Sequence, residues 1–309
     1  MIEVRGLSKR YGDKVAVDDL SFTVSPGVVT GFLGPNGAGK STTMRMILNL
    51  DHPDAGSVGV GGRCYRDLPA PMREVGALLE AKAFHPGRTA RAHLRWLALT
   101  GALSRNRVEE VLDIVGLAAV AGERVGGFSL GMYQRLGIAT ALLGDPAVLL
   151  FDEPANGLDP EGILWVRSLM RDLAAEGRAV FVSSHLMAEM QQTADRVVVI
   201  GQGRLVADVD VAELTKRGPG SRVRVVSPEP QKLSALLSEE GAVIDAAEGE
   251  ADAGMLVGGI DAPRIGEIAA ANGVRLYELS PRQTSLEAAF MELTHDSVAY
   301  RPKQPDGRR

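Results

Sequence analysis

Residues 28–41 read VVTGFLGPNGAGKS, a short apolar run followed by a glycine-rich loop. The loop satisfies the pattern GxxxxGK[ST], with Gly34 at its start and Lys40 and Ser41 at its end. The apolar run predicts a buried strand, and residues 40–49 predict a helix. Glycines let successive N–H groups surround a polyphosphate, and a following helix points its partial positive end at the same anion. This strand, loop and helix therefore predict a nucleotide phosphate site in an α/β fold.

The two polar residues at the end of the loop are expected to have different roles. Lys40 adds a full positive charge near the β- and γ-phosphates, and the Ser41 hydroxyl can ligate Mg²⁺. The other residues expected to bind the nucleotide belong to the loop and the first helical turn: Gly34, Pro35, Asn36, Gly37, Ala38, Gly39 and Thr42.

A second acidic site follows at residues 147–154, AVLLFDEP. Asp152 is expected to hold Mg²⁺ opposite Ser41. Glu153 is expected to approach the γ-phosphate and to orient or deprotonate an attacking water. Two acids that merely cap a strand are the alternative, but their place after a complete phosphate loop favours the catalytic reading. A glutamate here predicts hydrolysis rather than transfer to a substrate hydroxyl.

The rest of the chain predicts two domains. Further buried strands are expected at 179–184 and 196–201, with a helix at 161–176, so residues 1–217 predict a layered α/β domain. The stretch KRGPGS at 216–221 predicts a linker. Residues 218–295 then predict the order βαββαβ of a small α+β, ferredoxin-like module. Its expected elements are strands at 222–227, 242–246, 255–258 and 274–279, and helices at 231–240, 263–272 and 285–293. Residues 296–309 are expected to form a mobile tail.

The composition and net charge exclude several classes of protein. The 309 residues are 45% hydrophobic and 24% charged, which excludes a chain that is mainly disordered. A net charge of -5 does not suit a basic nucleic-acid binder. No apolar run approaches the roughly 20 residues of a membrane span, and the first residues predict no secretory signal. The single cysteine, Cys64, suits a reducing cytoplasm. A membrane role would therefore need another chain.

Four further segments carry a resemblance to a known family. FSLGM at 128–132 and the following YQRL are similar to the signature motif of ABC-type ATPases. ANGLD at 155–159 resembles the D-loop of that family, His185 its switch histidine, and Tyr11 the aromatic residue that stacks on adenine. The motifs span residues 1–217 in the family's order. The resemblance implies an ABC-type nucleotide-binding domain with a helical subdomain, and ATP with Mg²⁺ as cofactors.

The resemblance also implies roles for single residues. Ser129 and Gly131 would donate to the γ-phosphate held by a second copy of the chain, since a helix begins at Ser129. His185 would donate a hydrogen bond to the γ-phosphate and detect its loss. Asp159 would lie at the seam of the homodimer.

Two departures from the family pattern are visible. In the signature, Leu130 replaces a glycine, although Ser129 and Gly131 are kept. Glu80 stands where the family has a glutamine. A carboxylate there can still ligate Mg²⁺, but its charge beside the γ-phosphate is expected to slow hydrolysis. Glu80, the following segment to Ala90 and FSLGM resemble the ATP-binding subunits of bacterial antibiotic and multidrug exporters.

The expected function is therefore ATP hydrolysis that powers an exporter through a separate multi-span membrane permease. The chain would be cytoplasmic and attached to the inner face of the membrane through that permease, without nucleic acid. The alternative is a soluble ABC-type ATPase that acts on ribosomes or DNA, but such proteins usually carry two such domains or a coiled-coil insertion. A GTPase or small-molecule kinase is disfavoured, because the guanine-reading Asn-Lys-x-Asp is absent.

Overall fold

The computed structural model describes residues 1–217, 222–246, 254–282 and Leu286. The chain divides into two compact units, one formed by Met1–Asp210 and the other beginning at Val211. Helix α8 (Val211–Arg217) groups with the second unit. The domain boundary at residue 217 stays a prediction. The expected tail at 296–309, and the expected helix at 285–293 apart from Leu286, lie outside the described residues.

The larger unit contains a six-stranded sheet with the order β5-β6-β7-β3-β8-β9. Neighbouring strands are parallel except for β9, which is antiparallel to β8. The four strands expected in this unit are confirmed to within one residue at each end. The strands are β3 (Val29–Leu33), β5 (Val75–Leu78), β6 (Val148–Asp152), β7 (Ala179–Ser184), β8 (Arg196–Gly201) and β9 (Arg204–Asp210).

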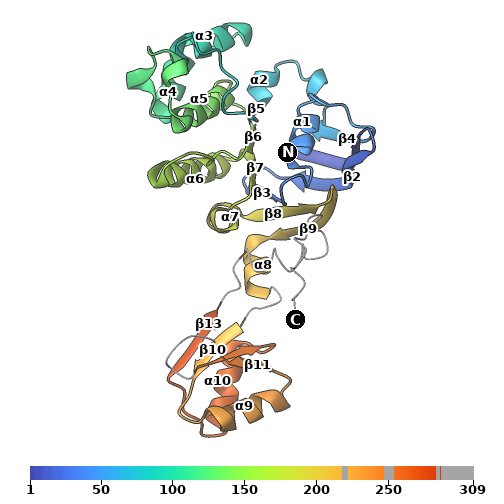
Figure 1. The fold of residues 1–309 in the computed structure, drawn as a ribbon, viewed down its shortest axis with the longest axis vertical. Helices are drawn as coiled ribbons and strands as arrows, with labels where there is room; N and C mark the ends of the chain where they lie inside the picture. The colour runs from blue at the N-terminus through green and yellow to red at the C-terminus, as the bar shows by residue number, and fades with distance from the viewer. Residues whose placement is uncertain (218–221, 247–253, 283–285, 287–309) are drawn as a thin grey trace, which may run out of the picture. The chain divides into compact units, whose positions relative to one another are not determined.

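Different layers cover the two faces of this sheet (Figure 1). Helices α6 (Pro160–Ala175) and α7 (Met187–Thr193) lie on one face. On the other lie α1 (Lys40–Ile47) and a second, antiparallel sheet with the order β2-β1-β4. The strands of this second sheet are β1 (Ile2–Tyr11), β2 (Lys14–Val24) and β4 (Ala55–Val60).

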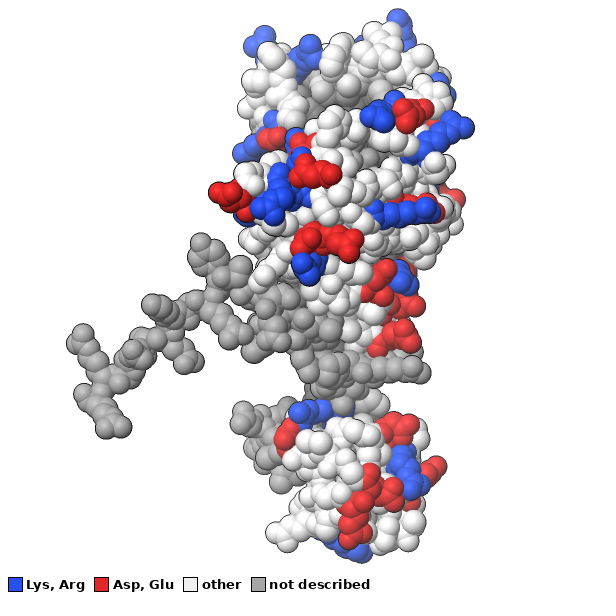
Figure 2. All heavy atoms as spheres, turned by 90° about the vertical axis from the view of Figure 1, so that its right-hand side faces the viewer, with Lys and Arg blue, Asp and Glu red and all other residues white. Residues whose placement is uncertain are grey.

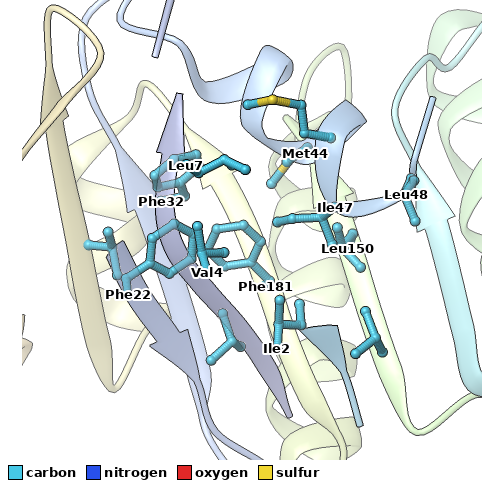
Figure 3. Close-up of a cluster of buried hydrophobic side chains, with 14 of the residues drawn as sticks. Ile2, Val4, Leu7, Phe22, Phe32, Met44, Ile47, Leu48, Leu150 and Phe181 are labelled. Atoms are coloured by element: carbon cyan, nitrogen blue, oxygen red, sulfur yellow. The ribbon is translucent and has the colours of Figure 1, made fainter. Parts of the chain in front are cut away.

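The main hydrophobic core fills the space between the two sheets (Figure 3). Phe22 of β2, Phe32 of β3 and Phe181 of β7 pack together with ring centroids 5.0 to 5.5 Å apart. Phe32 and Phe181 are fully buried. Aromatic pairs at such distances add about 0.5–1.5 kcal/mol beyond the burial of their area. The core thereby holds β3 and β7 in a fixed register below the phosphate loop.

A helical subdomain is inserted between β5 and β6. Its longer helices begin at residues whose hydroxyls accept a backbone N–H: Thr89, Ser104 and Ser129. The helices of the subdomain are α3 (Ala90–Thr100), α4 (Arg105–Ile114) and α5 (Leu130–Leu142). The short helix α2 (Pro71–Glu74) lies before β5. Short 3₁₀ turns lie at Tyr65–Asp67, Ala118–Val120 and Val125–Gly127.

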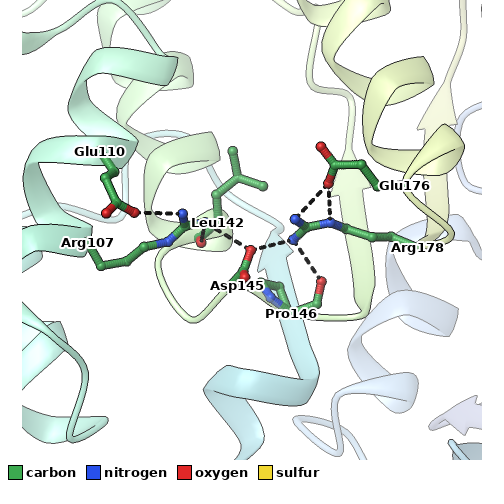
Figure 4. Close-up of polar contacts among 7 residues, drawn as sticks. All are labelled: Arg107, Glu110, Leu142, Asp145, Pro146, Glu176 and Arg178. Carbon is green, nitrogen blue, oxygen red and sulfur yellow. Dashed lines mark hydrogen bonds and ion pairs between the residues drawn. The ribbon is translucent and has the colours of Figure 1, made fainter.

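An ionic network ties this subdomain to the sheet (Figure 4). Asp145 lies in the turn between α5 and β6 and contacts Arg107 of α4 at 3.1 Å and Arg178, which precedes β7, at 2.9 Å. Arg107 also donates to the Leu142 carbonyl at 3.0 Å. The C-terminal end of α5 is therefore held from both sides.

The second unit has the ferredoxin-like topology expected from the sequence. Its sheet order is β11-β12-β10-β13, and all neighbours are antiparallel. The elements are β10 (Arg222–Val226), α9 (Pro230–Glu239), β11 (Val243–Ala246), β12 (Met255–Gly258), α10 (Ala262–Ala271) and β13 (Glu278–Arg282). The last strand begins four residues later than expected and includes Pro281, which is tolerated because β13 is an edge strand.

Charged side chains of both signs are interspersed on the face of the larger unit drawn in Figure 2. Many are paired, such as Arg196 with Asp208 at 2.7 Å. Within the described ranges, no helix has the length and apolar character to cross a membrane.

Candidate functional site

The expected phosphate loop lies at the carboxyl end of the parallel sheet. Three neighbouring strands end there: β3 before the loop, β6 at Asp152 and β7 at Ser184. In the strand register Leu33 pairs with Ser184, and Asp152 pairs with Ser183. Ligands of open α/β sheets bind at this edge because the loops that follow the strands meet there.

The glycines of the loop are required by its path. Gly37 and Gly39 have φ of 80° and 107°, a region that other residues rarely adopt. A Cβ at Gly39 would lie 2.4 Å from the Ala16 carbonyl oxygen, and one at Gly34 would lie 2.5 Å from that of Ile200. The backbone therefore passes closely between β2 and β8 before α1 begins.

Lys40 is the first residue of α1 and points back into the loop. Its Nζ donates to the carbonyl oxygens of Gly34 at 2.6 Å and Pro35 at 3.3 Å. Burial lowers the pKa of the Lys40 ammonium below its usual value, while the nearby Glu153 and Asp152 oppose that shift. The ammonium is thus weakly solvated and faces two carboxylates. A phosphate anion that binds here would form a favourable ion pair with this ammonium.

Ser41 and Asp152 meet directly, although 111 positions separate them. The Ser41 hydroxyl donates to Asp152 Oδ2 at 2.8 Å. The other carboxylate oxygen, Oδ1, accepts from the Ser183 hydroxyl. A hydroxyl and a carboxylate are the hard oxygen donors that Mg²⁺ takes. No group of three or more His, Cys, Asp or Glu in the described part of the chain could hold a metal. Ser41 and Asp152 would supply two ligands of a Mg²⁺ ion, which commonly takes its other ligands from phosphate and water.

The side chains of Glu153 and His185 also come together. Glu153 Oε2 and His185 Nδ1 are 2.7 Å apart. The Glu153 backbone has φ of 51°, in the left-handed region. After this turn the Glu153 carboxylate contacts His185, whereas the Asp152 carboxylate contacts Ser41 and Ser183. Its N–H donates to the Ser183 hydroxyl at 3.0 Å, and its carbonyl accepts from Gln134 Nε2 at 2.7 Å.

A cleft of about 600 Å³ joins most of these groups. The expected site residues that line it are Tyr11, Asn36, Gly37, Gly39, Lys40, Ser41, Thr42, Glu80, Asp152 and Glu153. Gly34, Pro35 and Ala38 belong to the loop but do not line the cleft. Its volume lies within the usual range for a small-molecule site.

Tyr11 lies at the rim of the cleft, at the end of β1. Its ring is about half exposed and its hydroxyl donates to Asp51 at 2.8 Å. Lys9 Nζ lies 5.5 Å from the ring centroid. The hydroxyl is thereby tethered at the rim of the cleft.

Ser129, Gly131 and Asp159 do not line the cleft of their own chain. Ser129 caps α5 by accepting from Met132 N–H at 3.2 Å, and Asp159 caps α6 by accepting from Gly162 N–H at 2.9 Å. A Cβ at Gly131 would lie 3.4 Å from Leu158. The start of α5 therefore packs against the loop at 155–159, at the protein surface beside the cleft.

Two residues of this site were missed in the sequence. Ser183 is fully buried, and it bridges Asp152 and the Glu153 backbone. Gln134 is 2% exposed and lines the cleft. A serine at the end of a strand beside Asp152 was a possible signal for the first. Nothing in the spacing of Gln134 pointed to Glu153.

Comparisons with known proteins show the family of this chain. Residues 17–156 match the ABC transporter family, and residues 221–287 match a domain family of unknown function, DUF8746. Similar proteins include the bacitracin transport ATP-binding protein BcrA of Bacillus licheniformis, 42% identical over 70% of this chain and 72% of that protein. YhcH of Bacillus subtilis, an uncharacterized ABC transporter ATP-binding protein, is 32% identical over 96% of this chain and 97% of that protein.

Two further likenesses point the same way. The Nod factor export ATP-binding protein I of Burkholderia orbicola is 38% identical over 77% of this chain and 80% of that protein. A solved ATP binding subunit of an ABC transporter is 30% identical, with a TM-score of 0.65, over 70% of this chain and 92% of that chain. The chain therefore belongs to the ABC transporter family, as an ATP-binding subunit whose ATP hydrolysis is coupled to transport.

Proposed function

We propose that this ATPase powers the export of an antibiotic- or multidrug-like compound through a separate multi-span permease, as one half of a homodimer at the inner face of the cell membrane. The observation that carries the proposal is the pairing of Ser41 with Asp152 and of Glu153 with His185 at one edge of the sheet. The first pair offers oxygen ligands for Mg²⁺, and the second offers a base with a partner that orients it. The relatives named for bacitracin transport and Nod factor export support the direction and kind of cargo.

The residues of the cleft suggest how hydrolysis proceeds. Lys40 would exchange the carbonyls of Gly34 and Pro35 for phosphate oxygens. Ser41, Asp152 and the more exposed Glu80 would hold Mg²⁺, which supplies charge neutralisation at the phosphates. Glu153 would accept a proton from the attacking water or orient it, while His185 holds that carboxylate in place.

The second copy would complete each site. Ser129 and Gly131 lie outside their own cleft, and the hydroxyl and N–H at the start of α5 are suited to bind an anion. In a two-fold symmetric dimer each copy would lend this helix end to the ATP of the other. Loss of the γ-phosphate would remove the shared anion and allow the two copies to separate.

A second hollow is suited to the permease. It measures about 800 Å³ and is lined mainly by apolar side chains, among them Leu50, Tyr65, Phe84 and Trp96. Glu80 lines this hollow and the nucleotide cleft alike. An apolar helix or loop of the permease that docks here would lie next to a group at the γ-phosphate. The segment from Glu80 to Ala90 would then carry motion between the two proteins.

The test is purification of the tagged full chain from membranes in mild detergent. The expected result is recovery of a hydrophobic multi-span protein, and cells that express both partners should tolerate higher concentrations of a peptide antibiotic such as bacitracin. The Glu153→Gln variant should still recover the partner but lose the tolerance. Copurification with ribosomes or DNA instead would favour the soluble alternative and overturn the proposal.

A further inference from the structure

The backbone of Glu153 adopts a conformation that its surroundings must impose. The strand β6 ends at Asp152, and the next residue turns into the left-handed region with φ of 51°. A side chain larger than hydrogen is disfavoured there, so such a turn persists only where neighbours hold it. The turn decides where the Glu153 carboxylate points.

Three structural elements hold this turn. The Ser183 hydroxyl of β7 accepts from the Glu153 N–H at 3.0 Å. The Glu153 carbonyl accepts from Asn156 N–H at 3.1 Å, within the turn itself, and from Gln134 Nε2 of α5 at 2.7 Å. Gln134 is the contact that comes from the helical subdomain.

Gln134 is a polar residue in a buried position where an apolar side chain would be expected. It is 2% exposed, and Gln134 Oε1 has no hydrogen-bond partner among the described residues. The orientation of the amide follows from its partner, because a carbonyl oxygen can accept only from the nitrogen. An unpaired buried acceptor is unfavourable, and an apolar side chain of the same length would fill this volume without one. The hydrogen bond to Glu153 is therefore the reason for an amide here.

The helix that carries Gln134 links two parts of the site. Leu130 and Gln134 are four positions apart, so they lie on the same face of α5, and both line the cleft. Ser129 caps the first turn of α5, and Gly131 packs against the loop at 155–159. The start of α5 and the contact with the Glu153 carbonyl therefore lie within about one turn of the same helix.

We propose that Gln134 is a positioning residue, which couples the location of the signature helix α5 to the direction of the Glu153 carboxylate. The inference rests on the proposed role of Glu153 in hydrolysis. It adds that hydrolysis is switched on through the backbone of Glu153 when α5 takes up its active position.

The test compares four variants of the full-length chain. Gln134→Met removes the donor and keeps the volume, whereas Gln134→Glu keeps the shape and replaces the donor by an acceptor. Thr193→Val is the matched control, since Thr193 is also 2% exposed and its hydroxyl donates to the Glu189 carbonyl of its own helix at 2.7 Å. Glu153→Gln reports on the proposed function itself. Each variant is measured for thermal melting, binding of a fluorescent ATP analogue, and kcat and KM of ATP hydrolysis.

We expect Gln134→Met to bind nucleotide within about 3-fold of wild type but to lose about 10- to 100-fold in kcat, the usual effect of a misplaced reacting group. Gln134→Glu should be as slow at pH 8 and recover as the pH falls toward 6, because a protonated carboxyl can donate to the Glu153 carbonyl. A merely structural role predicts no such recovery. Thr193→Val should keep wild-type kcat.

The results separate the two proposals. If Glu153→Gln stops turnover while Gln134→Met keeps a normal kcat, the coupling is wrong and the role of Glu153 stands. The same conclusion follows if Gln134→Glu shows the pH profile of Gln134→Met. If Glu153→Gln hydrolyses ATP at the wild-type rate, both the proposed role and the coupling are wrong.

Discussion

Replacing Ser183 by alanine tests whether one buried hydroxyl organises the acidic end of β6. The side chain is fully buried, donates to Asp152 and accepts from the Glu153 N–H at 3.0 Å. Its removal loses a charge-assisted hydrogen bond, worth about 1.5–3 kcal/mol, and leaves the partly buried Glu153 N–H without this acceptor, at about 1 kcal/mol. Both contributions come from the same hydroxyl oxygen and are not fully additive, so we expect the free energy of unfolding to fall by about 3 kcal/mol. In a unit of this size that lowers Tm by roughly 6–12 °C.

The matched control is Ser184→Ala. Ser184 is 3% exposed, and its hydroxyl accepts the Leu186 N–H at 2.9 Å, a contact that does not reach the acidic pair. Losing this neutral contact should cost about 1 kcal/mol, or roughly 2–4 °C. Differential scanning calorimetry of the full chain measures both Tm values, and a phosphate-release assay measures ATP turnover. Ser183→Ala should turn over ATP about 10- to 100-fold more slowly, because Glu153 is no longer held. Equal melting temperatures for the two variants, together with wild-type turnover in Ser183→Ala, would refute the reasoning.

Three further outcomes are expected. Glu153→Gln should bind ATP and form a dimer in size-exclusion chromatography, with kcat about 10²- to 10⁴-fold lower because the general base is lost; turnover near the wild-type rate would contradict the assignment. Burial lowers the pKa of the folded chain's His93 below the usual 6.5. Between that lowered pKa and 6.5 the unfolded chain binds more protons than the folded chain, so stability is lost as the pH falls below about 6.5. His93→Gln should flatten the dependence of Tm on pH between about 5 and 7, and an unchanged slope would contradict this expectation. Asp145→Asn should lower the free energy of unfolding by about 1 kcal/mol, because Arg107 and Arg178 lose their shared carboxylate. The loss should be smaller in about 1 M NaCl, and a loss that does not change with salt would contradict this explanation.

The second unit shows how far a pattern of elements reaches. Its order βαββαβ was readable from short runs of apolar residues, and the sheet order β11-β12-β10-β13 confirms the ferredoxin-like topology. The last strand was expected at 274–279, four residues before β13 begins, although β13 contains Pro281. Proline is excluded only where a strand must donate to neighbours on both sides, and β13 has one neighbour. The sequence does not state which strand will be at the edge.

The larger unit shows the same limit in its layers. The buried strands β3, β6, β7 and β8 are continuous apolar runs, and they were found. The strands of the antiparallel sheet, β1, β2 and β4, have mixed burial along their length and were not separately identified. Their place follows from the apolar faces they turn to the main sheet, as Phe22 does.

The sequence by itself determined the chemistry of this protein: a phosphate loop, an acidic pair behind a buried strand, and the family signature between them. Those features are local, because each depends on a few adjacent residues whose backbone path and charge are set by their own types. Only the tertiary structure decided which distant groups meet. Ser41 touches Asp152, Glu153 touches His185, and Ser183 and Gln134 hold the Glu153 turn because the order and register of the strands bring their ends to one edge. The strand order of the larger unit is a property of its packed sheet, and the spacing of these residues along the chain did not reveal their contacts.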